Sequence, residues 1–238
     1  MFEGGEVSTE RPTDATVVFL ARHGETRWNV ERRFQGHLDS DLSERGLEQA
    51  RRLGQRLAPE PLRAVYSSDL GRTRRTAEFV AGPHGLSVHT HAGLRVIDCG
   101  EWTGRMRSDV RSVPEWAAMM DRYRQRPSEH RMPGGETIRD VQARALAFLG
   151  EVASRHSGQS IAVISHHVVV ETMIAHAVGV PIEDLWLPYR GGNCFLSVLE
   201  IRAGVFRPKI IYDGDHIGEL AGLDGTKGET QGEIKGIT

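Results

Sequence analysis

The segment Arg22-His23-Gly24-Glu25-Thr26 combines residue types that suit the chemistry of a phosphate group. The guanidinium of Arg22 is a planar fork of hydrogen-bond donors that matches phosphate oxygens. The imidazole of His23 is a nucleophile that titrates near neutral pH, and Gly24 lets the backbone turn tightly behind it. This segment therefore predicts a phosphate-binding turn that carries a nucleophilic histidine.

Two apolar runs are expected to hold histidines at the ends of strands. Residues 16–20 precede Arg22, and their β-branched and aromatic side chains are typical of a strand buried on both faces. Residues 160–165 precede His166 in the same way. Open α/β sheets bind ligands at the carboxyl ends of their strands, so both histidines are expected in positions that suit a ligand site.

Helical patterns alternate with these apolar runs. Residues 44–58, 137–156 and 168–179 carry apolar side chains at three- and four-residue spacing and are predicted as helices. Residues 194–201 and 205–212 are predicted as a terminal hairpin. The alternation predicts an α/β fold in which a mainly parallel sheet is covered by helices on both faces.

Four motifs, taken in order, resemble those of the histidine phosphatase superfamily, in its phosphoglycerate-mutase-like phosphatase branch. The first is the segment around His23, and the second is SSDLGRTRRTA at residues 67–77, which makes Arg72 similar to the second phosphate-binding arginine of the family. The third is PGGET at residues 133–137, a turn before a long helix. In the fourth, His166 matches the second catalytic histidine, and the resemblance spans residues 17 to about 216.

The resemblance implies a three-layer α/β sandwich and a phosphoryl-transfer mechanism. It implies that His23 attacks phosphorus to form a phosphohistidine, that Arg22 and Arg72 hold the phosphoryl oxygens, and that His166 donates to them. Water then releases phosphate, with neither a metal nor another cofactor. The attacking nitrogen must be unprotonated, so activity should fall as the pH drops below the pKa of the histidine, which is roughly 6.5 when unperturbed.

The resemblance also implies which residues line the pocket and which class of substrate enters it. Asn29 is implied to line the pocket of a small phosphorylated metabolite. Residues 35–40 resemble a family loop over the pocket, which would add Gln35 and Gly36 to the substrate contacts, and a solvated turn is the alternative. Residues 105–132 look like the short insertion of the phosphatases, rather than the longer one that helps a mutase to retain a phosphorylated intermediate. Hydrolysis of a phosphomonoester is therefore expected, with a phosphoglycerate-type mutase as an alternative.

The sequence departs from the family at the proton donor. A glutamate usually protonates the leaving oxygen, but Val96 occupies its position here. Loss of a general acid typically costs a factor of about 10² to 10⁴ in rate. Asp98, which would share a face with Val96 in an extended segment, and Glu101 are the candidate substitutes, and the absence of any acid is the third option. Val96 also favours a noncatalytic phosphate-ligand-binding regulatory protein as an alternative function.

A different chemistry competes for the same segment. Cys99 and Arg105 have the spacing of the cysteine-dependent phosphatases, in which a loop of backbone N–H groups holds phosphate around a thiolate. Residues 94–98 are a short strand candidate before this loop. Trp102 is bulky for such a loop, which favours the histidine mechanism.

Arginines are concentrated between Trp102 and Gly134. A solvated helical face explains them most simply, whereas any that point into the pocket would bind a second anionic group on the substrate. They are Arg105, Arg107, Arg111, Arg122, Arg124, Arg126 and Arg131.

Length and composition limit the remaining possibilities. The chain has 238 residues, 39% of them hydrophobic and 26% charged, which suits one soluble α/β domain. A net charge of −2 argues against a main role in nucleic-acid binding. No run of about eighteen apolar residues suggests a membrane span. Cys99 and Cys194 lie far apart in different predicted strands and are not expected to form a disulfide framework, so a cytoplasmic location is expected.

Polar, glycine-rich ends are expected to flank one domain. Residues 1–14 and 217–238 are predicted as flexible tails, and residues 15–216 as the histidine phosphatase domain. The sequence leaves the oligomeric state open, and a homodimer is one option.

Overall fold

One mixed sheet forms the centre of the computed structural model, which describes residues 14–185 and 191–221. Among these residues six strands follow the order β3-β2-β4-β1-β5-β6. Neighbours from β3 to β1 are parallel, β5 is antiparallel to β1, and β6 is antiparallel to β5. The strands are β1 (Thr16–Arg22), β2 (Leu62–Ser67), β3 (Val88–Thr90), β4 (Ser160–Ser165), β5 (Leu196–Arg202) and β6 (Val205–Asp213).

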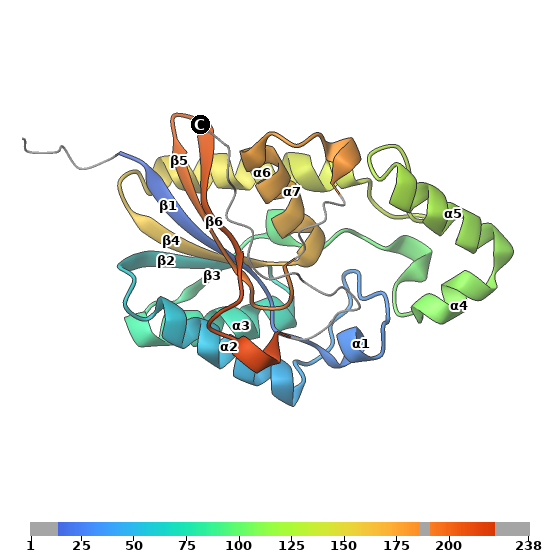
Figure 1. Ribbon diagram of the computed structural model, residues 1–238, viewed down its shortest axis with the longest axis horizontal. Coiled ribbons are helices and arrows are strands. Elements are labelled where there is room, and N and C mark those ends of the chain that lie inside the picture. The colour runs from blue at the N-terminus through green and yellow to red at the C-terminus, as the bar shows by residue number, and fades with distance from the viewer. Residues whose placement is uncertain (1–13, 186–190, 222–238) are drawn as a thin grey trace, which may run out of the picture.

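Helices cover both faces of the sheet, which confirms the predicted α/β sandwich (Figure 1). Four helices make these layers: α2 (Glu44–Leu57) and α3 (Gly71–Ala81) on one face, α6 (Ile138–Arg155) and α7 (His167–Val178) on the other. Three shorter helices lie beyond the end of the sheet at which β1 has its carboxyl end. They are α1 (Arg27–Val30), α4 (Arg107–Ser112) and α5 (Pro114–Gln125). Short 3₁₀ turns occur at Gly82–His84, Ala92–Leu94, Gly100–Trp102, Ile182–Asp184 and Gly218–Leu220.

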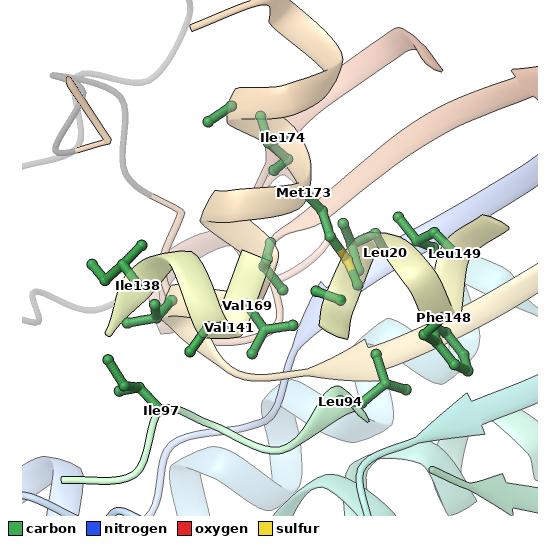
Figure 2. Packing of buried hydrophobic residues seen from close by; sticks show 14 of the residues in the cluster. Leu20, Leu94, Ile97, Ile138, Val141, Phe148, Leu149, Val169, Met173 and Ile174 are labelled. Carbon is green, nitrogen blue, oxygen red and sulfur yellow. The ribbon is translucent and has the colours of Figure 1, made fainter. Parts of the chain in front are cut away.

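The buried strand β1 divides the core because its successive side chains point to opposite faces. Val18 and Leu20 pack with α6 and α7, whereas Phe19 and Ala21 pack with α2 and α3. Figure 2 shows Leu20 beside Met173 of α7, in the cluster that α6 completes. With hydrophobic contacts on both faces, β1 fixes the position of the turn that follows it.

Capping groups set the helix starts that the sequence predicted. The Ser43 hydroxyl accepts a hydrogen bond from Gly46 N–H at 3.0 Å, and Thr137 forms a capping box with Asp140. Helix α7 begins directly after His166, which is its N-cap residue, and ends at Gly179 with a φ of 72°. These bounds place the His166 backbone at a helix N-terminus.

The predicted strand at residues 94–98 does not form. Residues 92–94 make a 3₁₀ turn, and the residues after it pair with no strand of the described chain. The guanidinium of Arg144 on α6 donates to the carbonyl oxygens of Gly93, Arg95 and Val96, at 2.8, 2.5 and 3.1 Å. A side chain thus satisfies backbone acceptors that a neighbouring strand would otherwise satisfy.

The described part of the chain continues past residue 216, where a flexible tail was predicted to begin. Ile217 is fully buried in the cluster beneath α2, and its carbonyl accepts a hydrogen bond from Arg52 at 3.0 Å. The Leu220 carbonyl accepts one from Gln49 at 2.7 Å. These contacts anchor residues 217–221 on α2, whereas residues 1–13 and 222–238 lie outside the described part of the chain.

The two strands at the borders of the sheet differ in length. The edge strand β3 has three residues, and the longer edge strand β6 contains Pro208 between Arg207 and Lys209.

Among residues 14–185 and 191–221, every helix is too short or too polar to cross a bilayer.

Candidate active site

His23 lies directly after β1, and its surroundings determine which ring nitrogen can react. The residue is 3% exposed, its N–H donates to the Ser165 carbonyl at 3.0 Å, and its own carbonyl accepts from the Asn193 amide at 2.8 Å. Its Nδ1 lies 2.7 Å from the Gly24 carbonyl oxygen. Because a carbonyl only accepts, Nδ1 carries the hydrogen and Nε2 of the neutral ring carries the lone pair.

Electrostatics keeps the His23 ring neutral. Burial, followed by the positive charges of Arg72 and Arg22, holds the pKa of His23 well below its ordinary value of 6.5. The ring is therefore unprotonated at neutral pH and has the form that a nucleophile needs.

Close backbone packing explains the glycine after His23. A Cβ at Gly24 would lie 2.4 Å from the carbonyl oxygen of Gly46 in α2, and the Gly24 N–H donates to the Thr76 hydroxyl of α3 at 3.0 Å. The turn thus contacts both helices, and a side chain at this position would push it away from α2.

Arg72, in the first turn of α3, is 2% exposed and anchored to the loop before α2. Its guanidinium donates to the carbonyl oxygens of Gly36 and Leu38, at 3.0 and 2.8 Å, and to the Asp39 carboxylate at 2.9 Å. Burial lowers the pKa of Arg72 to about 10, so the side chain stays charged at neutral pH. Asp39 also accepts from the Gly71 N–H at 2.6 Å, so one carboxylate caps α3 and fixes its arginine.

His166 lies opposite His23, at the junction of β4 and α7. The ring centroids are 5.2 Å apart with an interplanar angle of 66°, and Nε2 of His166 is 2.8 Å from the Ser68 hydroxyl. Burial, and then the positive charge of Arg72, hold the pKa of His166 well below 6.5. Arg22 is also buried and acts electrostatically on both histidines.

The four central residues expected from the sequence therefore share one buried site. His23 and Arg22 come from the end of β1, Arg72 from α3, and His166 from the start of α7. Such an arrangement presents a neutral nucleophile beside two guanidinium groups, which is what a phosphoryl group in transfer requires. Among the described residues, no group of three metal-ligating side chains is placed to hold a metal ion.

The three residues expected to line the pocket have different surroundings. The Asn29 side chain accepts from the N–H and the hydroxyl of Thr26, both at 3.1 Å, and so closes the capping box of α1. The Gly36 carbonyl accepts from Arg72, and a Cβ at Gly36, with φ at 51°, would lie 2.6 Å from the Thr103 hydroxyl. The buried Gln35 Oε1 accepts no hydrogen bond from the described residues. Substrate contacts of all three stay predictions.

The candidate acids lie in the loop that Arg144 holds. Asp98 accepts from the Gly100 N–H at 2.9 Å, so its carboxylate supports a local turn, and Glu101 is exposed. Val96 is half-buried, and its carbonyl oxygen is 3.0 Å from Nε2 of His37. A role for Asp98 or Glu101 in proton transfer therefore stays a prediction.

The surroundings of Cys99 contradict the cysteine-phosphatase alternative. The thiol is buried, and burial raises the pKa of Cys99 to about 12, so the thiolate that such an enzyme needs is absent at neutral pH. Arg105 is exposed and stacks on Trp116, with 4.7 Å from its guanidinium carbon to the ring centroid. Arg105 therefore makes a contact on the surface of the insertion.

Other arginines of the insertion make contacts of two kinds. Arg111 pairs with Asp121 at 2.8 Å and Arg126 with Glu129 at 3.2 Å, both on the surface. Arg107, in contrast, stacks on Phe34 at 5.4 Å, next to the loop that binds Arg72. The expected solvated face thus accounts for part of the cluster.

The sequence analysis did not predict some of the residues that organise the site. Asn193 and Arg144 support backbone segments far away in the chain, and no local pattern marks them. Ser68 belongs to the motif that contains Arg72, so its position next to a strand end was the available signal.

Comparison with known proteins agrees with this geometry. The model of the histidine phosphatase superfamily (branch 1) matches residues 18–213. Phosphoserine phosphatase 1 of Hydrogenobacter thermophilus is 37% identical over 169 residues, covering 71% of this chain and 79% of that protein. A probable phosphoglycerate mutase GpmB of Salmonella choleraesuis is 34% identical over 186 residues, covering 77% of this chain and 84% of that protein.

Solved structures give the same assignment. Bacillus stearothermophilus YhfR is 36% identical and has a TM-score of 0.82, covering 85% of this chain and 100% of that one. A mycobacterial glucosyl-3-phosphoglycerate phosphatase is 25% identical and has a TM-score of 0.75, covering 83% and 99% respectively. The sequence motifs, the fold and these matches agree, and the chain belongs to branch 1 of the histidine phosphatase superfamily.

Proposed function

We propose that the protein hydrolyses the phosphomonoester of a small phosphorylated metabolite through a phosphohistidine at Nε2 of His23. The observation that carries this proposal is the contact between Nδ1 of His23 and the Gly24 carbonyl. It leaves the Nε2 lone pair for attack, while burial and the neighbouring guanidiniums keep the ring neutral.

The reaction has two steps that the same residues serve. In the first, Nε2 of His23 forms a bond to phosphorus, the bond from phosphorus to the ester oxygen breaks, and this oxygen takes a proton from Asp98, Glu101 or solvent and leaves as the alcohol. In the second, a water oxygen attacks phosphorus and gives up a proton, the bond to Nε2 breaks, and phosphate leaves. Arg22, Arg72 and His166 stabilise the phosphoryl oxygens in both transition states.

Hydrolysis is favoured over a mutase reaction by the size of the insertion. The segment between Trp102 and Gly134 contains only the short helices α4 and α5. Two of the matched relatives have phosphatase names, whereas GpmB has the name of a probable mutase. A mutase must retain its phosphorylated intermediate, and a short insertion leaves water easier access to it.

Val96 favours a second candidate, a noncatalytic protein that binds phosphorylated ligands. Valine cannot protonate the leaving oxygen, and this matters most for poor leaving groups such as alkoxides. Both candidates require the same phosphate-binding groups, so binding alone does not distinguish them. The measurement that does is turnover of a phosphorylated substrate.

The decisive test measures hydrolysis of aryl and alkyl phosphates of graded leaving-group pKa, without added metal. We compare the wild type with His23→Ala and with a control, His176→Ala, which changes an exposed histidine on α7. Turnover that disappears only in His23→Ala supports the proposal. Turnover that persists in His23→Ala overturns it, and phosphate binding without any turnover assigns the protein to the binding class.

A further inference from the structure

A chain of two hydroxyl groups ends on the second histidine of the site. The Ser68 Oγ lies 2.8 Å from Nε2 of His166 and 2.6 Å from Oγ1 of Thr73. Ser68 and Thr73 are fully buried, and His166 is 1% exposed. Within the described residues, Nδ1 of His166 makes no hydrogen bond, whereas Nε2 has the Ser68 hydroxyl as its partner.

One arrangement of hydrogens along this chain suits a neutral imidazole. Thr73 donates its O–H to Ser68, Ser68 donates to Nε2 of His166, and the ring hydrogen remains on Nδ1. Ser68 Oγ is also 3.3 Å from the Leu70 N–H, which donates to it. Every hydroxyl hydrogen then has an acceptor.

The reverse arrangement suits a protonated imidazole. Nε2–H of His166 donates to Ser68, Ser68 donates to Thr73, and Thr73 donates to the Leu70 carbonyl oxygen, 2.7 Å away. Conversion between the two states needs one proton from solvent and a rotation of two hydroxyl groups, with no movement of heavy atoms. The Leu70 carbonyl loses nothing in the first arrangement, because the backbone N–H groups of Thr73 and Arg74 already donate to it, both at 3.1 Å.

The charges around His166 make this reversal useful. Three guanidinium groups disfavour its protonated form electrostatically: Arg72 of α3, Arg22 at the end of β1, and Arg144 of α6. His23, the titratable group that faces it from β1, adds to this effect only when it is itself protonated. A bound phosphoryl group would bring negative charge into the same site and oppose this effect. A ring that is neutral in the free protein and protonated in the complex needs a partner that serves both forms.

We propose that Ser68 and Thr73 are positioning residues that reverse their hydrogen bonds and so let His166 take up a proton when a phosphoryl group binds. This proposal rests on the proposed function for its phosphoryl ligand. Nδ1–H of His166 then donates to a phosphoryl oxygen in either arrangement, and in the protonated one the ring adds a full positive charge.

The test removes one hydroxyl without changing the shape of the side chain. In Thr73→Val, Ser68 can still donate to the neutral ring. It has no acceptor for its own hydrogen when Nε2–H donates to it, because the site is buried. We therefore expect the pKa of His166 in the phosphate complex to fall by about one unit, and Thr73→Ser to restore it.

The measurement is a pH titration of His166 by ¹⁵N NMR in protein saturated with inorganic phosphate, with the resonance assigned by its loss in His166→Asn. Thr172→Val is the matched control, since Thr172 is a buried helical threonine that donates to the Val169 carbonyl at 2.8 Å. Ser68→Ala, which removes the partner of Nε2, is the second variant and should lower the same pKa. The alkaline limb of kcat should move to lower pH in both variants.

Each result decides the proposal. An unchanged pKa in Thr73→Val and Ser68→Ala, or a wild-type His166 that does not respond to phosphate, overturns it. A kcat lowered by the same factor at every pH with no shift of the titration assigns the hydroxyls a structural role and also overturns it. Absence of wild-type turnover would refute the proposed hydrolysis alone, because the titration is independent of turnover.

Discussion

At the scale of single residues, burial decides the protonation state of the nucleophile. The pKa of His23 is held well below 6.5, so the ring should stay neutral at pH values where an exposed histidine is already charged. We expect the acid limb of kcat/KM, corrected for ionisation of the substrate, to lie at a lower pH than the ordinary histidine pKa of 6.5. A ¹⁵N titration of His23 in phosphate-free protein checks the assignment, and a midpoint at or above 6.5 would contradict it.

Arg72 supplies a second residue-scale prediction. Its planar guanidinium makes three hydrogen bonds to the loop before α2, and a lysine cannot reproduce that geometry. We expect Arg72→Lys to lower kcat/KM by a factor of about 10² to 10³. Steady-state kinetics with an aryl phosphate measures the effect, and Arg74→Lys, an exposed neighbour on α3, should behave like the wild type.

The residue at position 96 allows a gain of function. In Val96→Glu a carboxyl group occupies the position that usually holds the acid in this family, and alkyl phosphates depend on an acid more than aryl phosphates do. We expect hydrolysis of alkyl phosphates to rise by up to about 10²-fold, with little change for aryl phosphates. An equal gain in Val96→Gln, which has the same shape and no acidic proton, would show that the gain comes from another cause.

At the scale of elements, periodic patterns made most of the fold predictable. Strands β1 and β4 and helices α2, α6 and α7 were all expected, because each has an apolar face or a buried run long enough to recognise. Strand β3 was missed because it has three residues, of which His89 and Thr90 are exposed. The loop after it was expected as a strand because its apolar residues resemble one, while the deciding contact comes from Arg144, far away in the chain.

That contact gives an element-scale prediction. Removal of the Arg144 guanidinium leaves the carbonyl oxygens of residues 93, 95 and 96 without this donor and breaks its ion pair with Glu136. We expect Arg144→Ala to lower the free energy of unfolding by about 1 to 3 kcal/mol, measured by urea denaturation. Arg155→Ala, which breaks an exposed pair with Glu151 on the same helix, should change it by less than about 0.5 kcal/mol.

At the scale of the whole molecule, the site makes stability depend on pH. His23 and His166 have lowered pKa values in the folded protein, so between those values and about 6.5 the unfolded chain binds protons that the folded protein does not. The free energy of unfolding should therefore decrease as the pH falls below about 6.5. Thermal melts across this range test the linkage, and a Tm independent of pH between about 7 and 5 would count against it.

The candidate site was predictable to the extent that chemistry follows from local motifs. Arg22, His23, Arg72 and His166 each stand next to a strand end or a helix start that the sequence reveals. The hydroxyl chain behind His166 was not predictable, because its geometry depends on how α3 packs against β4. Short motifs therefore identify the reactive groups of the site. Long-range packing determines which hydroxyl groups exchange hydrogen bonds with them.

The two ends of the sheet bear on how copies of the chain can associate. Strand β3 offers three residues for pairing, and β6 presents Pro208, which has no N–H, between the charged residues Arg207 and Lys209. In the described part of the chain, neither border of the sheet therefore offers a second copy a long uninterrupted ladder of backbone donors and acceptors. We therefore expect a homodimer to be held together by side chains on another surface, with no pairing of edge strands across the two molecules.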